Sequence, residues 1–83
     1  PVTLAASQFA STPDPAANAD TAERLVREAA ARGAQVVLLQ ELFATPYFCI
    51  TERAEHFALA APAEGHPLVA RFAALARELG VVL

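Results

Sequence analysis

The chain has 83 residues, of which 55% are hydrophobic and 18% are charged, a composition typical of a globular protein rather than a disordered one. The net charge is −3, and the 6 basic residues are all arginines scattered along the sequence, which excludes the basic patch of a nucleic-acid-binding protein. The chain has no apolar run of about 18 residues, the length that a membrane-spanning helix needs. The single cysteine excludes an internal disulfide and fits a reducing cytoplasm.

The first half of the chain predicts a strand, a helix and a second strand. Residues 2–8 are apolar and β-branched at their start and end on polar side chains, which is typical of a strand. Asp14 followed by Pro15 is a strong helix start, and Gly33 provides the left-handed stop. The apolar run at residues 35–40 predicts a strand that is covered on both faces. This order forms a βαβ unit with parallel strands.

The second half predicts two further helices and the beginning of a third strand. Residues 52–60 are expected to form a short helix that is capped by Thr51. Residues 67–79 repeat the helical pattern, which Gly80 ends. Residues 81–83 read as the opening of a buried strand. We therefore expect the whole chain to be the N-terminal part of a single longer domain, cut at its third strand.

Glu41 stands inside the most apolar segment of the chain, VVLLQELFATPYFC at residues 36–49. An ionised carboxylate is costly to bury alone, so Glu41 is exposed by a turn, is paired, or performs chemistry. Ligands of parallel α/β sheets bind beyond the carboxyl ends of the strands, where Glu41 is expected. On position alone, function and a structural role in a cap or an ion pair stay open as equal alternatives. Gln8, at the end of the first strand, is expected to hold this region through hydrogen bonds.

The residues around this glutamate carry a resemblance to a known family. The string LLQELF-x-TPYFC, preceded by VREAAARGAQVV and by an opening VTLAASQF, resembles the nitrilase superfamily of carbon–nitrogen hydrolases, and within it the N-carbamoylputrescine amidases. The resemblance covers the whole chain. It implies an α/β fold, the N-terminal portion of a four-layer αββα sandwich that begins with the βαβ unit. It also implies a Glu-Lys-Cys mechanism without a metal or an organic cofactor, in which a thiol attacks an amide, nitrile or carbamoyl carbon.

Of the three catalytic residues of that family, only the glutamate maps onto this chain, as Glu41, the general base and proton acceptor. The family's Lys and Cys lie further along, and the chain contains no lysine, so we expect these 83 residues alone to be inactive. A general base works best with a pKa near the working pH, and poor hydration raises the pKa of a carboxylate in that direction. We therefore expect Glu41 in a poorly hydrated, apolar setting.

The loop that follows the glutamate supplies the other candidate site residues. By the resemblance it borders the substrate pocket, where Tyr47 and Phe48 would cover the methylenes of an alkyl amine; the alternative is that both are ordinary core aromatics. Cys49 lies in an aromatic loop, not in the electropositive setting of a catalytic thiol, and is expected to be a small buried residue or part of the pocket wall. With His56 and His66 it has no ligand spacing, so no metal site is expected.

The resemblance implies a hydrolase for a small-molecule carbamoyl amine, closest to N-carbamoylputrescine, which would yield putrescine, carbon dioxide and ammonia in polyamine synthesis. Another amidase of the superfamily, such as a β-ureidopropionase, is one alternative. A non-enzymatic α/β binding module is the other, since a fold does not determine a function, although a glycine-rich phosphate loop is missing. Family members commonly associate with one another, so a homo-oligomer is expected. The composition and the single cysteine favour a cytoplasmic protein without nucleic-acid or membrane partners.

Overall fold

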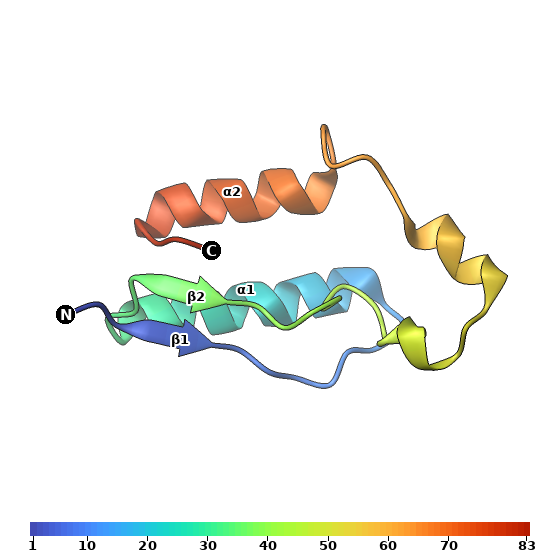
Figure 1. Cartoon of the computed structure of the whole chain (residues 1–83). Coiled ribbons are helices and arrows are strands. Elements are labelled where there is room, and N and C mark those ends of the chain that lie inside the picture. Colours follow the sequence, from blue (N-terminus) through green and yellow to red (C-terminus); the bar gives the residue numbers. More distant parts are fainter.

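Two parallel strands, two α-helices and two short 3-10 helices make up the computed structural model, which describes residues 1–83 (Figure 1). The elements follow one another as β1 (Leu4–Ala6), α1 (Pro15–Ala31), β2 (Val36–Leu38), η1 (Phe48–Ile50), η2 (Ala54–Leu59) and α2 (Pro67–Leu79). A single parallel bridge between Val36 and Val82 adds the start of a third strand. The predicted α/β class and βαβ order are confirmed.

Helix α1 begins and ends where its sequence signals place it. The carboxylate of Asp14 accepts hydrogen bonds from the backbone N–H groups of Ala16 and Ala17, at 3.0 and 3.3 Å, and Pro15 is the first helical residue. After the last turn, Gly33 has φ 93°, a conformation that glycine adopts without the steric cost of a Cβ atom. Both ends of the helix are therefore determined by a few adjacent residues.

Helix α2 is closed by a histidine at its start and a glycine at its end. Nδ1 of His66 accepts a hydrogen bond from the backbone N–H of Leu68 at 3.1 Å, so the imidazole takes the capping role more often filled by Ser or Asp. Gly80 has φ 66° and donates its N–H to the carbonyl of Ala76. Neither α1 nor α2 has both the length and the apolar character needed to cross a membrane.

The sheet is parallel, as predicted, but its strands are shorter than predicted. Its register pairs three residues of each strand: Leu4 with Val36, Ala5 with Val37 and Ala6 with Leu38. On the other edge of β2, the N–H of Val82 donates to the carbonyl of Gln35 at 2.9 Å, and the N–H of Val37 donates to the carbonyl of Val82 at 2.8 Å. The beginning of a third strand at residues 81–83 is therefore confirmed, but it is not buried as predicted, since Val82 and Leu83 are 63% and 40% exposed.

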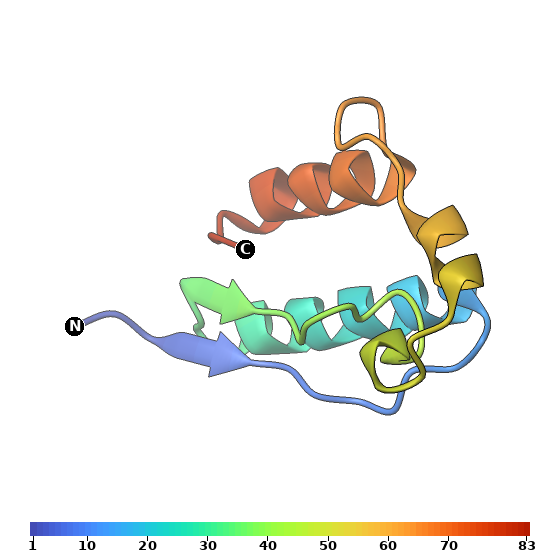
Figure 2. The same cartoon turned by 45° about the vertical axis from the view of Figure 1, so that its right-hand side comes forward.

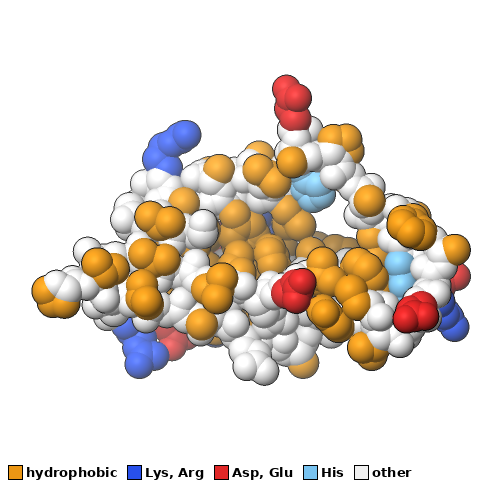
Figure 3. Space-filling model, in the orientation of Figure 1, with side chains coloured by type: hydrophobic (Ala, Val, Ile, Leu, Met, Phe, Trp, Pro, Cys, Tyr) orange, Lys and Arg blue, Asp and Glu red, His pale blue; other side chains and the backbone are white.

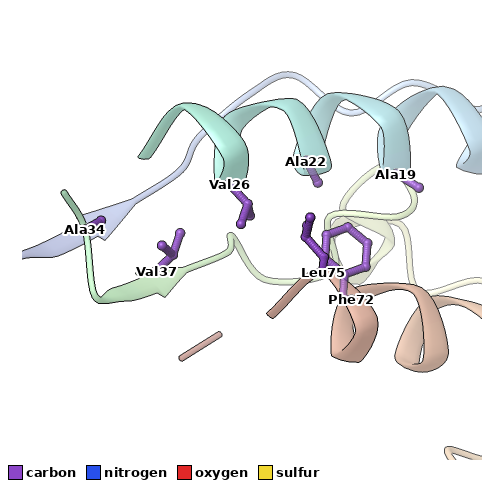
Figure 4. Packing of buried hydrophobic residues seen from close by; sticks show 7 residues of the cluster. All are labelled: Ala19, Ala22, Val26, Ala34, Val37, Phe72 and Leu75. Carbon is purple, nitrogen blue, oxygen red and sulfur yellow. The ribbon is translucent and has the colours of Figure 1, made fainter. Parts of the chain in front are cut away.

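The core lies between the sheet and the two helices, which cover the same face of it (Figure 4). Its buried members come from α1, α2, β2 and the segment between α1 and β2: Ala19, Ala22, Val26, Phe72, Leu75, Val37 and Ala34. Val26 and Val37 are 0% and 2% exposed and form the centre of the contact between helix and sheet. Only 8 of the 83 residues are buried, so this core is small for the length of the chain.

The second face of the sheet is bare, which corrects the prediction that residues 35–40 are covered on both faces. Leu38 is 68% exposed, and its neighbours on the same face, Leu4 and Val82, are 71% and 63% exposed. Figure 3 shows hydrophobic side chains gathered over this part of the molecule. The apolar run is typical of a strand between two layers, and the helices of this chain supply only one of them.

Between β2 and α2 the chain forms an exposed arch, residues 47–66, that stands to one side of the helices and the sheet (Figure 2). The short helix predicted at residues 52–60 is confirmed only in part: residues Ala54–Leu59 form the 3-10 helix η2 rather than an α-helix, and it has no side-chain cap. The hydroxyl of Thr51 does not cap it but donates to the carbonyl of Phe48 at 2.9 Å and closes η1. A short helix needs a surface to pack against, and no residue of the arch is buried.

A network of ion pairs joins α1 to α2. The guanidinium of Arg27 contacts both carboxylate oxygens of Glu78, at 2.8 and 3.0 Å, and also contacts Glu23. The guanidinium of Arg71 contacts Glu23 at 2.7 Å and Asp20 at 2.8 Å. The hydrogen bond from Arg71, followed by that from Arg27, holds the pKa of the Glu23 carboxyl below its ordinary value. Glu23 is therefore the carboxylate that connects the two arginines.

Replacing Glu23 by glutamine in the complete protein removes the charge that both arginines share. We expect Glu23→Gln to lower Tm by about 1–3 °C near neutral pH. The difference should shrink below the ordinary carboxyl pKa of 4.5, because a lowered native pKa contributes stability that is present above that value and is lost as the native carboxylate protonates. Thermal unfolding of both proteins at neutral pH and at about pH 3.5 measures the Tm difference at each pH. Glu64→Gln, in an exposed loop, is the control, and a Tm difference that does not depend on pH contradicts the assignment.

Candidate active site

Glu41 is the first residue of a turn at residues 41–44 that follows the carboxyl end of β2. This is the end of a parallel sheet at which ligands bind in α/β proteins. The side chain of Glu41 is exposed, so the prediction of a poorly hydrated setting is wrong for these 83 residues taken alone. Its apolar neighbours in sequence, Leu39 and Phe43, pack against the core, and the turn between them leaves the carboxylate outside.

Gln40, the residue before Glu41, continues the pairing of the two strands with its side chain. Its Oε1 accepts a hydrogen bond from the N–H of Phe9 at 2.6 Å, and its Nε2 donates to the carbonyl of Phe9 at 2.8 Å. Nε2 also contacts the hydroxyl of Ser11 at 3.3 Å. Because the side chain takes over the pairing, the backbone is free to leave the sheet at Glu41. The prediction that Gln8 holds this region is wrong, since Gln8 is exposed and Gln40 makes these contacts.

Leu42, directly after Glu41, has φ 55°. A positive φ is uncommon outside glycine, asparagine and aspartate, and this left-handed conformation costs a residue with a Cβ atom roughly 1–2 kcal/mol. The turn is closed by the N–H of Thr45, which donates to the carbonyl of Leu42 at 3.2 Å. Backbone strain of this kind persists only where the surrounding contacts impose it. The reversal of the chain at Glu41 is therefore held in place from outside the turn.

Two side chains from the N-terminal part of the chain bind the last two residues of this turn. The hydroxyl of Ser11 donates to the carbonyl of Phe43 at 3.2 Å, and Nδ2 of Asn18 donates to the carbonyl of Ala44 at 3.0 Å. Within the turn, the ring of Phe43 packs edge-on against Phe72 of α2, with ring centroids 5.3 Å apart. The turn thus contacts both helices and the segment between β1 and α1.

These supporting residues were not predicted from the sequence, although the position of Asn18 within its helix carried a signal. Asn18 stands four and eight residues before Ala22 and Val26, on the stripe of α1 that faces the core, and it is 2% exposed. A polar side chain on an apolar stripe must find hydrogen-bond partners inside the protein. The roles of Ser11 and Gln40 had no comparable signal, because their partners are backbone groups of distant residues.

The loop after the turn places Tyr47 within the electrostatic influence of Glu41. The negative charge of the Glu41 carboxylate raises the pKa of the Tyr47 phenol above its ordinary value, and the side chain of Cys49 is the second cause. Tyr47 is 49% exposed. Cys49 is exposed rather than buried, so of its two predicted roles the buried one is wrong and that of a pocket-wall residue is confirmed. The Tyr47 phenol is therefore within electrostatic range of the Glu41 carboxylate, and both side chains are at the surface.

An open hollow of about 880 Å³ lies between residues 42–45 and the arch. Most of its lining is hydrophobic and includes Phe48 and Cys49, whereas Glu41 and Tyr47 are not part of it. The ring of Phe48 packs against that of His56, with centroids 5.2 Å apart. No group of three or more His, Cys, Asp and Glu side chains is placed to hold a metal ion. The arrangement combines an exposed carboxylate with a neighbouring phenol and an adjacent apolar hollow, without a metal centre.

Known proteins are similar to this chain along nearly its whole length. Residues 3–83 match the carbon–nitrogen hydrolase family. The N-carbamoylputrescine amidase of Solanum lycopersicum is 52% identical over 82 residues, which are 99% of this chain and 27% of that protein. The N-carbamoylputrescine amidases of Solanum tuberosum and Oryza sativa subsp. japonica are 52% and 51% identical over the same shares. The chain thus spans 27% of the length of these curated relatives, and it belongs to the carbon–nitrogen hydrolase family.

Proposed function

We propose that the complete protein hydrolyses the carbamoyl group of a small carbamoyl amine, with N-carbamoylputrescine as its substrate. One water is consumed, and putrescine, carbon dioxide and ammonia are released. The observation that carries this proposal is the identity of 49–52% over 99% of the chain to four N-carbamoylputrescine amidases. Membership of a hydrolase family favours an enzyme over a non-enzymatic binding module. A β-ureidopropionase activity is the alternative within the family.

Glu41 is proposed as the proton acceptor of a thiol-based mechanism. A cysteine thiol is a weak nucleophile until a base takes its proton. Glu41 offers a carboxylate at the carboxyl end of β2, on a turn whose backbone is strained and supported from outside. The 83 residues contain no lysine, so the ammonium group of the triad, and with it the nucleophilic cysteine, would come from elsewhere in the protein. These residues alone are therefore expected to be inactive.

The exposure of Glu41 in this chain is compatible with that role if the rest of the protein covers it. We propose that residues 1–83 form the N-terminal part of one αββα domain, whose other parts pack on the bare sheet face. The exposed Leu4, Leu38 and Val82 support this, because an apolar sheet face needs a second layer. Covering the site would also reduce the hydration of Glu41. A homo-oligomer and a cytoplasmic location stay predictions.

Tyr47 and Phe48 are proposed as substrate-binding residues. The Glu41 carboxylate raises the pKa of the Tyr47 phenol, which is a hydrogen-bond donor at neutral pH. Phe48 lines the apolar hollow on the other side of the same loop. An aromatic wall of this kind suits the methylenes of an alkyl amine, while the phenol would orient a polar group. Neither side chain is buried, which argues against an ordinary core role within this chain.

Glu41→Gln in the complete protein tests the proposed base. Glutamine keeps the size and hydrogen-bonding groups of the side chain but does not take up the proton of a thiol, so kcat should fall by ~10²–10⁴-fold. Steady-state rates with N-carbamoylputrescine and with N-carbamoyl-β-alanine measure this and separate the two candidate substrates. Glu28→Gln, on the exposed side of α1, is the matched control. Retained activity in Glu41→Gln removes Glu41 as the base.

Cys49→Ser tests whether the one thiol of these residues is the nucleophile. Cys49 lies in η1 and is exposed, so we expect the complete variant protein to keep its kcat to within about threefold. The rate should be measured together with the circular dichroism spectrum. A folded variant without activity would show that Cys49, rather than a cysteine outside these residues, attacks the carbamoyl carbon.

The proximity of Tyr47 and Glu41 is testable by titration, since Tyr47 is the single tyrosine of these 83 residues. The phenol of the folded chain should titrate above the ordinary value of 10.0. Glu41→Gln should lower its pKa, because the carboxylate charge that opposes the tyrosinate is removed. The ultraviolet absorbance of tyrosinate gives the pKa, and circular dichroism confirms the fold. Glu28→Gln is the control, and an unchanged pKa in Glu41→Gln contradicts the proximity.

A further inference from the structure

Asn18 is a buried side chain whose hydrogen bonds join α1 to the turn that carries Glu41. We propose that Asn18 is a positioning residue for Glu41 and that it acts, together with Ser11, through the backbone of residues 42–44. Asn18 is 2% exposed, so it would hold the chain that carries the base rather than touch a substrate. This inference rests on the proposed function, because it takes Glu41 as the proton acceptor.

The amide of Asn18 uses every hydrogen-bonding position it has. Its Oδ1 accepts from the N–H of Thr12 at 2.8 Å and from the hydroxyl of Thr12 at 3.1 Å. Its Nδ2 donates to the carbonyl of Thr12 at 2.7 Å and to the carbonyl of Ala44 at 3.0 Å. A backbone N–H only donates and a carbonyl only accepts, so these partners determine which way the amide faces. An amide whose donors and acceptors are all satisfied in this way is held in one orientation.

The network fixes the chain on both sides of Glu41. On the near side, Gln40 is bound to the backbone of Phe9. On the far side, Asn18 and Ser11 each donate to a carbonyl of the turn, and these two bonds span 26 and 32 positions in the sequence. The segment that carries the carboxylate is therefore attached at residue 40 and again at residues 43 and 44, with only two residues between the attachments.

The strained backbone inside this short interval makes the far attachment important for the base. Leu42, with φ 55°, would relax toward negative φ if its neighbours allowed it, and such a rotation displaces Glu41 on one side or residues 43 and 44 on the other. The bonds from Asn18 and Ser11 oppose that displacement. A misplacement of about 1 Å at a catalytic group can lower a rate by about 10²-fold. Loss of the Asn18 amide should therefore act on catalysis through Glu41.

A double-mutant cycle in the complete protein tests this role. The variants are Asn18→Ala, Glu41→Gln and the pair, with kcat and KM for N-carbamoylputrescine as the readout. We expect Asn18→Ala to lower kcat about 10- to 100-fold, with KM changed by less than about threefold. The same substitution should cost less than about threefold when Glu41 is already glutamine, because a residue that acts through the carboxylate has no further effect without it.

Val26→Ala is the matched control for a general loss of stability. Val26 lies on the same stripe of α1 and is 0% exposed, but it donates no hydrogen bond to the turn. It should lower Tm and leave kcat, measured well below Tm, within about threefold. If Asn18→Ala does not fold, Ser11→Ala carries the test. It deletes one hydroxyl, and its expected loss of about 3- to 10-fold in kcat should also vanish in the Glu41→Gln background.

The outcomes separate this inference from the function on which it rests. Equal losses in the two backgrounds overturn the positioning role and leave Asn18 as a structural residue of an enzyme whose base is still Glu41. A loss of kcat in Val26→Ala as large as in Asn18→Ala overturns it as well. Full activity of Glu41→Gln overturns the proposed base itself, and with it the positioning role.

Discussion

The backbone of β2 is hydrogen-bonded along both edges, and the rest of the chain is placed relative to it. β1 pairs with one edge, and Val82 bonds to Gln35 and Val37 on the other. Val37 is at the same time buried beneath the two helices, so a shift of this strand by one residue would exchange its buried and exposed side chains. The register of a strand of three residues therefore determines where the sheet ends and where the turn with Glu41 begins.

At that end of β2, hydrogen bonds from side chains replace the backbone hydrogen bonds between the two strands. The side chain of Gln40 binds the backbone N–H and carbonyl of Phe9. The turn beyond Gln40 is held by hydrogen bonds from Ser11 and Asn18. This arrangement lets the backbone take the unfavourable conformation at Leu42 without losing its position. A strained turn needs support from several elements. This need explains why Asn18, the buried polar residue of this small core, lies next to the turn.

The bare sheet face and the exposed Glu41 have the same physical origin. The two helices cover one face of the sheet, the beginning of the third strand pairs with its edge, and no residue of the arch is buried. The apolar residues of β2 and the hollow beside the arch are therefore open in this chain. The chain spans 27% of the length of its curated relatives, and open apolar surface of this kind is typical of an interaction surface.

The sequence by itself determined the features that adjacent residues encode. Asp14 with Pro15, Gly33 and Gly80 set the ends of the helices, because capping depends on one or two neighbours, and the apolar run located β2 and the glutamate after it. Only the tertiary structure decided that the Asn18 amide binds the carbonyl of Ala44, that Gln40 rather than Gln8 holds the turn and that residues 52–60 form no α-helix. These outcomes depend on contacts between residues about 26 to 32 positions apart, or on the lack of them, and local propensity contains no information about such contacts.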